Sequence, residues 1–242
     1  MNYHQTSKHV AHLKGEARAQ YVQRLFARIA FRYDLMNRLM TAGQDVRWRR
    51  EVIRRARLQP GDRLLDLGAG TGDLAREALR QQSQCRPLAA DFTLAMMLVG
   101  RRRPGNTIRR WSAADALRLP FPDASFDAVV SGFLLRNVID VQQVLHEQYR
   151  TLKPGGRCAA LDTTRPRRSL LSPFIRFHMH RLIPLLGRLF TGQADAYTYL
   201  PDSTETFLTA EDLAARLKIV GFQEVGFVRK MSGTVAIHWG MK

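Results

Sequence analysis

The spacing of apolar residues divides the chain into segments of different periodicity. Apolar positions recur at roughly helical spacing in residues 16–57, which predicts an N-terminal helical segment. From residue 58 onward, short apolar runs alternate with helical patterns. The runs that predict strands span residues 64–67, 87–90, 108–114, 126–131 and 158–161. Strands that alternate with helices in this way indicate a parallel sheet with helices on both faces, and therefore an α/β fold.

The pattern changes after residue 165. Residues 166–200 form an apolar stretch interrupted by arginines and histidines, and a helical pattern follows at 210–220. Two last strands, 224–229 and 234–238, are joined by a short turn and predict an antiparallel hairpin at the edge of the sheet. We therefore predict a helical cap (1–57), an α/β core (58–165), an inserted lid (166–200), and a last helix and hairpin (201–242) that complete a seven-stranded, mostly parallel sheet.

Composition adds one unusual property, a large positive charge. The chain has 242 residues, a formal net charge of +17 and 45% hydrophobic residues, so it can bury a core of ordinary size. The arginine excess is compatible with a nucleic-acid partner, an anionic membrane surface or a solvated surface without a partner. The two cysteines share no motif spacing and indicate neither a metal site nor a disulfide framework. No secretory or membrane-spanning run is visible, so we expect a cytoplasmic protein.

A glycine-rich turn follows the first predicted strand, where residues 66–72 read DLGAGTG. Glycines let the main chain approach a ligand closely, and the start of the next helix offers unpaired N–H groups. Asp91, beside Phe92, ends the second strand, and its carboxylate could accept hydrogen bonds from ribose hydroxyls. Asp115 and Ala116 follow the third strand, where an adenine could bind. These features indicate a cofactor that contains a nucleoside, either a dinucleotide or S-adenosylmethionine.

The segment LPFPDASFDAVVS, residues 119–131, favours the second cofactor. With it, the order and spacing of the motifs resemble the class I S-adenosylmethionine-dependent methyltransferases, which have a Rossmann-like fold. The resemblance implies that the glycines hold the methionine part of S-adenosylmethionine, that Asp91 holds its ribose, and that Asp115 and Ala116 hold its adenine. The predicted cofactor-binding residues are Tyr33, Asp66, Gly68, Gly70, Thr71, Gly72, Asp91, Phe92, Asp115, Ala116 and Gly132.

Further motifs resemble the menaquinone and ubiquinone C-methyltransferase family. They are FARIAFRYDLMN (26–37), LLRNV (134–138), YRTLKPGGR (149–157), YTYLPDS (197–203), GF (221–222) and VAIHWGMK (235–242). The resemblance implies methylation of a ring carbon of a demethylated polyprenyl quinol, and our first hypothesis is a menaquinone precursor rather than a ubiquinone precursor. The chain departs from the family at Gly132, where relatives carry a serine that contacts the cofactor. Ser131 lies one position earlier and therefore faces the other side of the strand.

Carbon methylation needs an electron-rich ring and a base for the proton that leaves. We predict Arg136, His178 and Tyr197 as catalytic residues, and we expect Arg136 to reach the substrate from the carboxyl edge of the sheet. Alternatives remain, since His178 could be a satisfied pocket histidine and Tyr197 a substrate wall. Further candidates are Tyr199, Asp162 and His180.

The inserted stretch 166–200 helps to predict which partner the positive charge serves. Its broad apolar side, with arginines near the edge, predicts an amphipathic lid for a prenyl tail at an anionic membrane surface, and the alternative is a plain cap helix. We therefore expect a peripheral enzyme at the inner face of the membrane, with a lipid-soluble quinol as substrate and no nucleic-acid partner; a homodimer is left open. The other acceptors considered are a different small aromatic or lipid molecule and RNA. RNA is disfavoured because no added RNA-binding domain and no Asn-Pro-Pro-Tyr motif are present.

Overall fold

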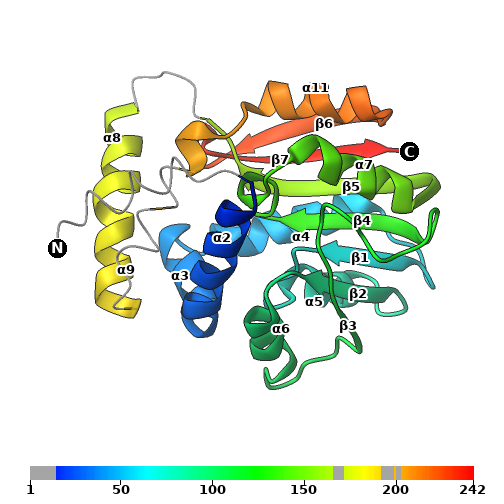
Figure 1. The fold of residues 1–242 in the computed structure, drawn as a ribbon, viewed down its shortest axis with the longest axis horizontal. Coiled ribbons are helices and arrows are strands. Elements are labelled where there is room, and N and C mark those ends of the chain that lie inside the picture. The colour runs from blue at the N-terminus through cyan, green and yellow to red at the C-terminus, as the bar shows by residue number, and fades with distance from the viewer. Residues whose placement is uncertain (1–14, 166–171, 192–198, 200–202) are drawn as a thin grey trace.

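A seven-stranded sheet organises the chain in a computed structural model, which describes residues 15–165, 172–191, 199 and 203–242 (Figure 1). The strands are β1 (Arg63–Leu67), β2 (Arg86–Asp91), β3 (Arg110–Ala113), β4 (Phe126–Gly132), β5 (Leu152–Thr163), β6 (Gln223–Lys230) and β7 (Val235–Met241). Their order is β3-β2-β1-β4-β5-β7-β6. The first five strands run parallel, whereas β7 is antiparallel to both β5 and β6. The predicted fold, including the antiparallel hairpin at the edge, is confirmed.

Helices cover both faces of this sheet. The described helices are α2 (Gly15–Ile29), α3 (Tyr33–Met40), α4 (Gln44–Ala56), α5 (Asp73–Gln81), α6 (Leu94–Arg101), α7 (Val141–Thr151), α8 (Ser172–Phe177), α9 (Ile183–Thr191) and α11 (Ala210–Val220). Single turns of 3-10 helix lie at Ala30–Arg32, Leu135–Asn137 and Met231–Gly233, and a π-helical turn spans His178–Leu182.

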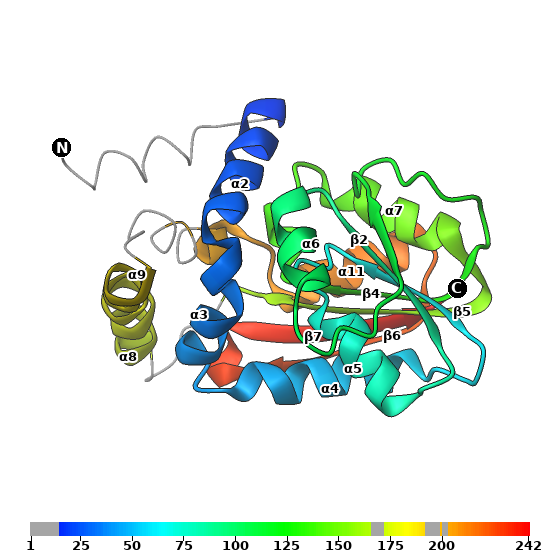
Figure 2. The same ribbon diagram turned by 90° about the horizontal axis from the view of Figure 1, so that it is seen from below.

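Each face of the sheet has its own buried cluster, because successive side chains along a strand point to opposite faces. In β1, Leu65 packs in one buried cluster with Val144 of α7, whereas its neighbour Leu64 packs in another with Val52 of α4. Figure 2 shows α4 and α5 on one side of the sheet and α7 and α11 on the other. Residues buried on both faces explain why the central strands are continuous apolar runs rather than alternating ones.

Three of the differences between the sequence-based boundaries and the structure have an identifiable local cause. The predicted helical segment 16–57 is broken by the 3-10 turn and again after Met40, where Ala42 and Gly43 have positive φ values of +49° and +74°. The fifth strand begins at Leu152 rather than at residue 158, because the Pro-Gly-Gly run at 154–156 lies in a register shift of the β4–β5 ladder and does not end the strand. The third strand is shorter than predicted, since Ile108 is buried in the core ahead of it.

The N-terminal helices and the inserted segment lie side by side (Figures 1 and 2). Ile183 and Leu186 of α9 pack on a buried cluster that includes Leu25 of α2 and Met36 of α3. The predicted apolar stripe of a regular helix is altered by the π-helical turn at His178–Leu182, which shifts the residues after it around the axis. No helix in the described part of the chain is long and apolar enough to cross a membrane.

Candidate active site

A cleft lies where β1, β2 and β4 end at the carboxyl edge of the sheet, the usual position of ligands in open α/β sheets. It contains about 1170 Å³ of empty space, part of which is open to solvent. All predicted cofactor-binding residues except Gly72 line it. Those residues are Tyr33, Asp66, Gly68, Gly70, Thr71, Asp91, Phe92, Asp115, Ala116 and Gly132. Segments far apart in sequence therefore converge on one cavity.

Two glycines of the loop after β1 leave room at the floor of the cleft. Gly68 has a φ of +67°, and a Cβ there would lie 2.8 Å from Leu134 Cδ1. Gly70 has a φ of +56°, and a Cβ there would lie 3.2 Å from Met96 Cε. Both positions thus favour glycine for backbone conformation, and at Gly68 a larger residue would also crowd Leu134. These two glycines have no side chain of their own to cover the main chain of the loop, so a ligand in the cleft can contact the main chain closely.

Gly72, the third glycine predicted to bind the cofactor, does not line the cleft. Its φ is +87°, and a Cβ would lie 2.6 Å from Ile108 Cδ1 and 2.8 Å from Trp111 Cη2. Its N–H donates to Ala69 O at 2.8 Å. The third glycine therefore permits close packing of the loop against the β3 side of the core, rather than forming a wall of the cleft.

Asp91 closes the loop from the end of β2. Its Oδ2 accepts the Gly70 N–H at 2.7 Å, and its Oδ1 accepts the Thr93 N–H at 2.6 Å. Each carboxylate oxygen can accept a second hydrogen bond, so the group can still receive the two hydroxyls of a ribose. Burial raises the pKa of Asp91 above its ordinary value, while the N–H donors oppose that shift.

Asp66 provides a second carboxylate at the floor of the cleft. Its Oδ2 accepts the Ala75 N–H at 2.9 Å, whereas its Oδ1 is buried and has no hydrogen-bond partner among the described residues. Burial raises the pKa of Asp66 to about 7, and the negative charges of Asp91 and Asp73 add to the shift. An unsatisfied buried acceptor of this kind fits the ammonium group of the methionine part of S-adenosylmethionine.

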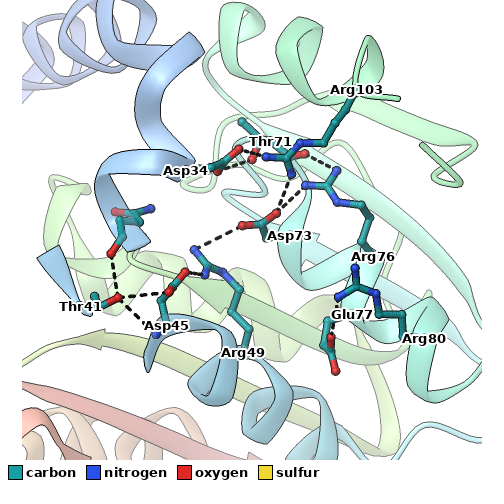
Figure 3. Close-up of polar contacts among 11 residues, drawn as sticks. Asp34, Thr41, Asp45, Arg49, Thr71, Asp73, Arg76, Glu77, Arg80 and Arg103 are labelled. Carbon is teal, nitrogen blue, oxygen red and sulfur yellow. Dashed lines mark hydrogen bonds and ion pairs between the residues drawn. The ribbon is translucent and has the colours of Figure 1, made fainter. Parts of the chain in front are cut away.

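A network of ion pairs joins the N-terminal helices to the loop (Figure 3). Thr71 Oγ1 donates to Asp34 Oδ1 at 2.8 Å, and Arg103 bridges Asp34 and Asp73, with 2.9 Å between its Nη1 and Asp73 Oδ1. Arg49 of α4 lies on the other side of Asp73, with 3.5 Å between Nη2 and Oδ2. Although burial opposes its ionisation, Arg49 and its neighbours lower the pKa of Asp73. Ion pairs and a hydrogen bond thus hold the N-terminal cap against the cofactor loop.

The predicted catalytic residue Arg136 lies behind the cleft wall. Its side chain is buried, at 6% exposure, and the guanidinium carbon lies 5.1 Å from the centre of the Phe133 ring. Its main-chain N–H points to Asp162 Oδ2 at 3.3 Å. Arg136 is not among the cleft-lining residues, whereas its neighbour Asn137 is. The loop 134–138 therefore reaches the cleft as predicted, but it is Asn137 rather than Arg136 that lines the cleft.

The other candidate acids and bases differ in their position relative to the cleft. Tyr199 reaches the cleft wall by donating its hydroxyl to Asn137 Oδ1 at 3.1 Å. His180 pairs with Glu205 at 2.7 Å and is partly exposed. Tyr197 lies outside the described residues, as does the side chain of His178, so the roles of both stay predictions. In the described part of the chain, no group of three or more His, Cys, Asp or Glu side chains could hold a metal ion.

Gly132 lies in the cleft wall opposite Leu74 of α5. A Cβ at this position would be 3.3 Å from Leu74 Cδ1, so a larger residue would need a small shift of that side chain. Ser131 is buried and does not line the cleft, in keeping with its place on the other side of the strand. Ser131 therefore does not supply the hydroxyl that Gly132 lacks.

Sequence reasoning did not single out Arg49, which also lines the cleft. A signal was available, because Arg49 lies in the same helical stripe as Asp45, Val52 and Ala56, all of which are buried. A charged residue within the apolar stripe of a helix needs a buried partner. Arg49 has two such partners: Asp45, one helical turn earlier, and Asp73, which follows directly after the glycine loop.

The sheet topology and the glycine loop give this chain the Rossmann-like fold of the class I S-adenosylmethionine-dependent methyltransferases. The fold is similar to that of a Thermotoga maritima protein described as a S-adenosylmethionine-dependent methyltransferase, possible histamine N-methyltransferase, with a TM-score of 0.65 and 19% identity over 91% of this chain and 99% of that one. It is also similar to phosphoethanolamine N-methyltransferase 2 of Haemonchus contortus in complex with S-adenosylmethionine, with a TM-score of 0.57 and 17% identity over 78% of this chain and 50% of that one.

The chain belongs to the ubiE/COQ5 methyltransferase family, whose model matches residues 14–242. It is 45% identical to the ubiquinone/menaquinone biosynthesis C-methyltransferase UbiE of Desulfotalea psychrophila, over 91% of this chain and 90% of that protein. It is 41% identical to the demethylmenaquinone methyltransferase of Thermus thermophilus, over 89% of this chain and 99% of that protein. The resemblance seen in the motifs, and S-adenosylmethionine as cofactor, are thereby confirmed.

Proposed function

We propose that this enzyme transfers the methyl group of S-adenosylmethionine to a ring carbon of a demethylated polyprenyl quinol, with a menaquinone precursor as the first candidate. The observation that carries the proposal is the match over nearly the whole chain to relatives that bear these names. It extends to the cap and to the loop 134–138, where an acceptor would bind, and is not confined to the cofactor loop.

The cleft has two chemically different parts, which suits this pair of substrates. Around the glycine loop its walls carry the carboxylates of Asp66 and Asp91. Its remaining walls are largely apolar, with Val22 and Phe26 from α2 and Val138 from the loop after β4. A polar half suits the cofactor, and an apolar half suits a quinol ring with a prenyl tail.

The chemistry requires alignment more than a strong acid or base. S-adenosylmethionine supplies an electrophilic methyl group, and the quinol ring supplies the electron pair for the new C–C bond and then loses a proton. Held in line within the cleft, the two reactants gain most of the available acceleration from positioning. The hydrogen bond from Tyr199 to Asn137 fixes one part of the apolar wall, and Arg136 places a positive charge behind it. Such a charge would favour the phenolate form of the acceptor.

Mass analysis of products with isotope-labelled S-adenosylmethionine tests this proposal. We expect one labelled methyl group on a ring carbon of the demethylated quinol and much less transfer to the oxidised quinone. Asp91→Asn should reduce transfer to every acceptor, because it acts on the cofactor. Transfer to a different aromatic or lipid molecule, or to RNA, with none to any quinol, would refute the assignment of the acceptor.

We also propose that the enzyme works at the inner face of a membrane from the cytoplasm, where its substrate resides. Large apolar side chains are exposed on neighbouring segments, with Phe31 at 87% and Phe174 at 73% exposure. Phe177, Leu185 and Leu189 are exposed on α8 and α9 as well. Arg181 and Arg188 are exposed on the same segment, and an apolar surface edged with arginines suits anionic lipids.

Co-sedimentation with vesicles tests the membrane proposal. Vesicles that contain anionic lipid should retain the protein, and Phe31→Ser combined with Phe174→Ser should weaken retention at least severalfold. Ile219→Ser is the matched control, because Ile219 is 74% exposed on α11, away from α8 and α9 (Figure 1). Equal retention of all three proteins would argue against this surface. Size measurement in solution would decide in the same samples whether a homodimer forms.

A further inference from the structure

Arg49 occupies an unusual position for a charged residue. It projects from α4 with only 11% of its side chain exposed, and it lines the cleft. Among the described cleft-lining residues it is the only lysine, arginine or histidine, whereas Asp34, Asp66 and Asp91 are acidic. Asp45 and Asp73 compensate the charge of Arg49, so the guanidinium stays ionised although it is buried beside the cleft.

The guanidinium of Arg49 is held in place by two carboxylates, but these do not occupy all of its N–H donors. Nη1 is bonded to Asp45, one helical turn earlier, and the Asp45 N–H donates to Thr41 Oγ1 at 3.3 Å (Figure 3). Nη2 lies 3.5 Å from Asp73 Oδ2, longer than the ~2.7–2.9 Å of a good charge-assisted hydrogen bond. A guanidinium has five N–H donors, so this arrangement orients the group and leaves donors for a ligand.

The chemistry of the cofactor supplies one suitable anion. S-adenosylmethionine has two hydroxyls on its ribose, a sulfonium, and an amino acid end that bears an ammonium and a carboxylate. Asp91 suits the hydroxyls, and the unpartnered Oδ1 of Asp66 suits the ammonium. The carboxylate needs a donor with a positive charge, and Arg49 is the basic group at hand in the described cleft wall.

We propose that Arg49 binds the α-carboxylate of S-adenosylmethionine, with Asp45 and Asp73 holding the guanidinium in position. The cap would then contribute directly to the cofactor site, instead of only covering it. This inference rests on S-adenosylmethionine as methyl donor and is independent of the acceptor. A failure of the quinol proposal would leave it standing, since it is tested by binding alone.

Calorimetry with two ligands separates this role from a structural one. Decarboxylated S-adenosylmethionine keeps the sulfonium and the ammonium but lacks the carboxylate. For S-adenosylmethionine, Arg49→Gln should weaken binding roughly 10- to 100-fold, the range for a charge-assisted hydrogen bond. For the decarboxylated ligand, the same substitution should change affinity less than about threefold. Arg49→Lys should restore part of the affinity for S-adenosylmethionine, because it keeps the charge but loses the fork of donors.

Arg103→Gln is the matched control. Arg103 also pairs with Asp73, but it does not line the cleft, so any effect should be the same for both ligands. Equal losses for both ligands in Arg49→Gln would overturn the proposal and leave Arg49 a purely structural residue. If Arg49→Gln does not fold, Arg49→Lys takes its place, and its loss of affinity must be larger for S-adenosylmethionine than for the decarboxylated ligand. Equal wild-type affinities would also overturn the proposal.

Discussion

The hydroxyl of Thr71 in the glycine loop donates a 2.8 Å hydrogen bond to Asp34 of α3. The two residues lie 37 positions apart, one in the cofactor loop and the other in the N-terminal cap. Asp34 also pairs with Arg103, which follows α6 (Figure 3). Burial and the nearby negative charge of Asp73 raise the pKa of Asp34. One hydrogen bond thus links the position of the cap to the conformation of the loop.

Loss of this bond should destabilise the protein measurably. We expect Thr71→Val to lower the free energy of unfolding by about 1–2 kcal/mol, because it leaves a buried carboxylate with one donor fewer. Urea unfolding measures the change. A double-mutant cycle with Asp34→Asn should give a coupling energy of about 0.5–3 kcal/mol, since the residues are in direct contact. Thr107→Val, at an exposed position, is the control, and a coupling near zero would contradict a direct bond in solution.

Asp66 should make stability and cofactor binding depend on pH. Its pKa in the folded protein is about 7, above the ordinary value of 3.8, mainly because of burial. The folded state therefore holds this proton more tightly than the unfolded state, so stability is greatest below about pH 4 with respect to this group and declines as the pH rises to about 7. Unfolding of Asp66→Asn should lack that decline.

Cofactor binding should show the opposite dependence. An ammonium group beside Asp66 favours the carboxylate form, so binding should release a proton and should tighten as the pH rises toward 7. Between pH 6 and 7 the gain should be about fivefold if the bound carboxyl has a pKa well below 6, because the ionised fraction of the free carboxyl rises by that factor. Calorimetry in buffers of different ionisation enthalpy counts the released proton. An affinity that is constant between pH 5.5 and 7.5 would show that Asp66 does not contact a positive group of the ligand.

Asp91 should dominate the hold on the ribose. Asp91→Ala removes a carboxylate that can accept both hydroxyls, and we expect binding of S-adenosylmethionine to weaken by on the order of 1–3 kcal/mol. Asp123→Ala is a charge-matched control, because Asp123 pairs with Arg150 and does not line the cleft. Unchanged affinity in Asp91→Ala, measured by calorimetry, would place the ribose elsewhere.

Gly72 should matter for stability through space as well as backbone conformation. Gly72→Ala would place a methyl group 2.6 Å from Ile108 Cδ1, whereas Gly61→Ala would meet nothing within 4 Å at the same φ of +87°. Both variants carry the strain of a left-handed alanine, so their difference isolates the clash. We expect Gly72→Ala to be less stable than Gly61→Ala by about 1–3 kcal/mol in urea unfolding. Equal stabilities would indicate that the core relaxes around the methyl group at no cost.

The sequence by itself determined the class of fold and much of the cofactor site. Apolar runs, glycines and strand-end carboxylates are local features, set by residues next to one another, and they placed Gly68, Gly70 and Asp91 correctly around one cleft. The motifs near both ends also identified the family. These features could be read because alternation and turn chemistry depend on short stretches of chain.

Only the tertiary structure decided which distant charges meet. Asp34 and Arg103 are 69 positions apart, and the approach of Arg49 to Asp73 depends on how α4 packs against α5. It also decided that Arg136 lies behind the cleft wall and that Asn137 lines the cleft. Gly72, in turn, packs closely against Ile108 and Trp111. The physical reason is that a side chain's partners depend on the packing of whole helices and strands. Local periodicity reveals which face of an element is buried, but not which residue lies opposite.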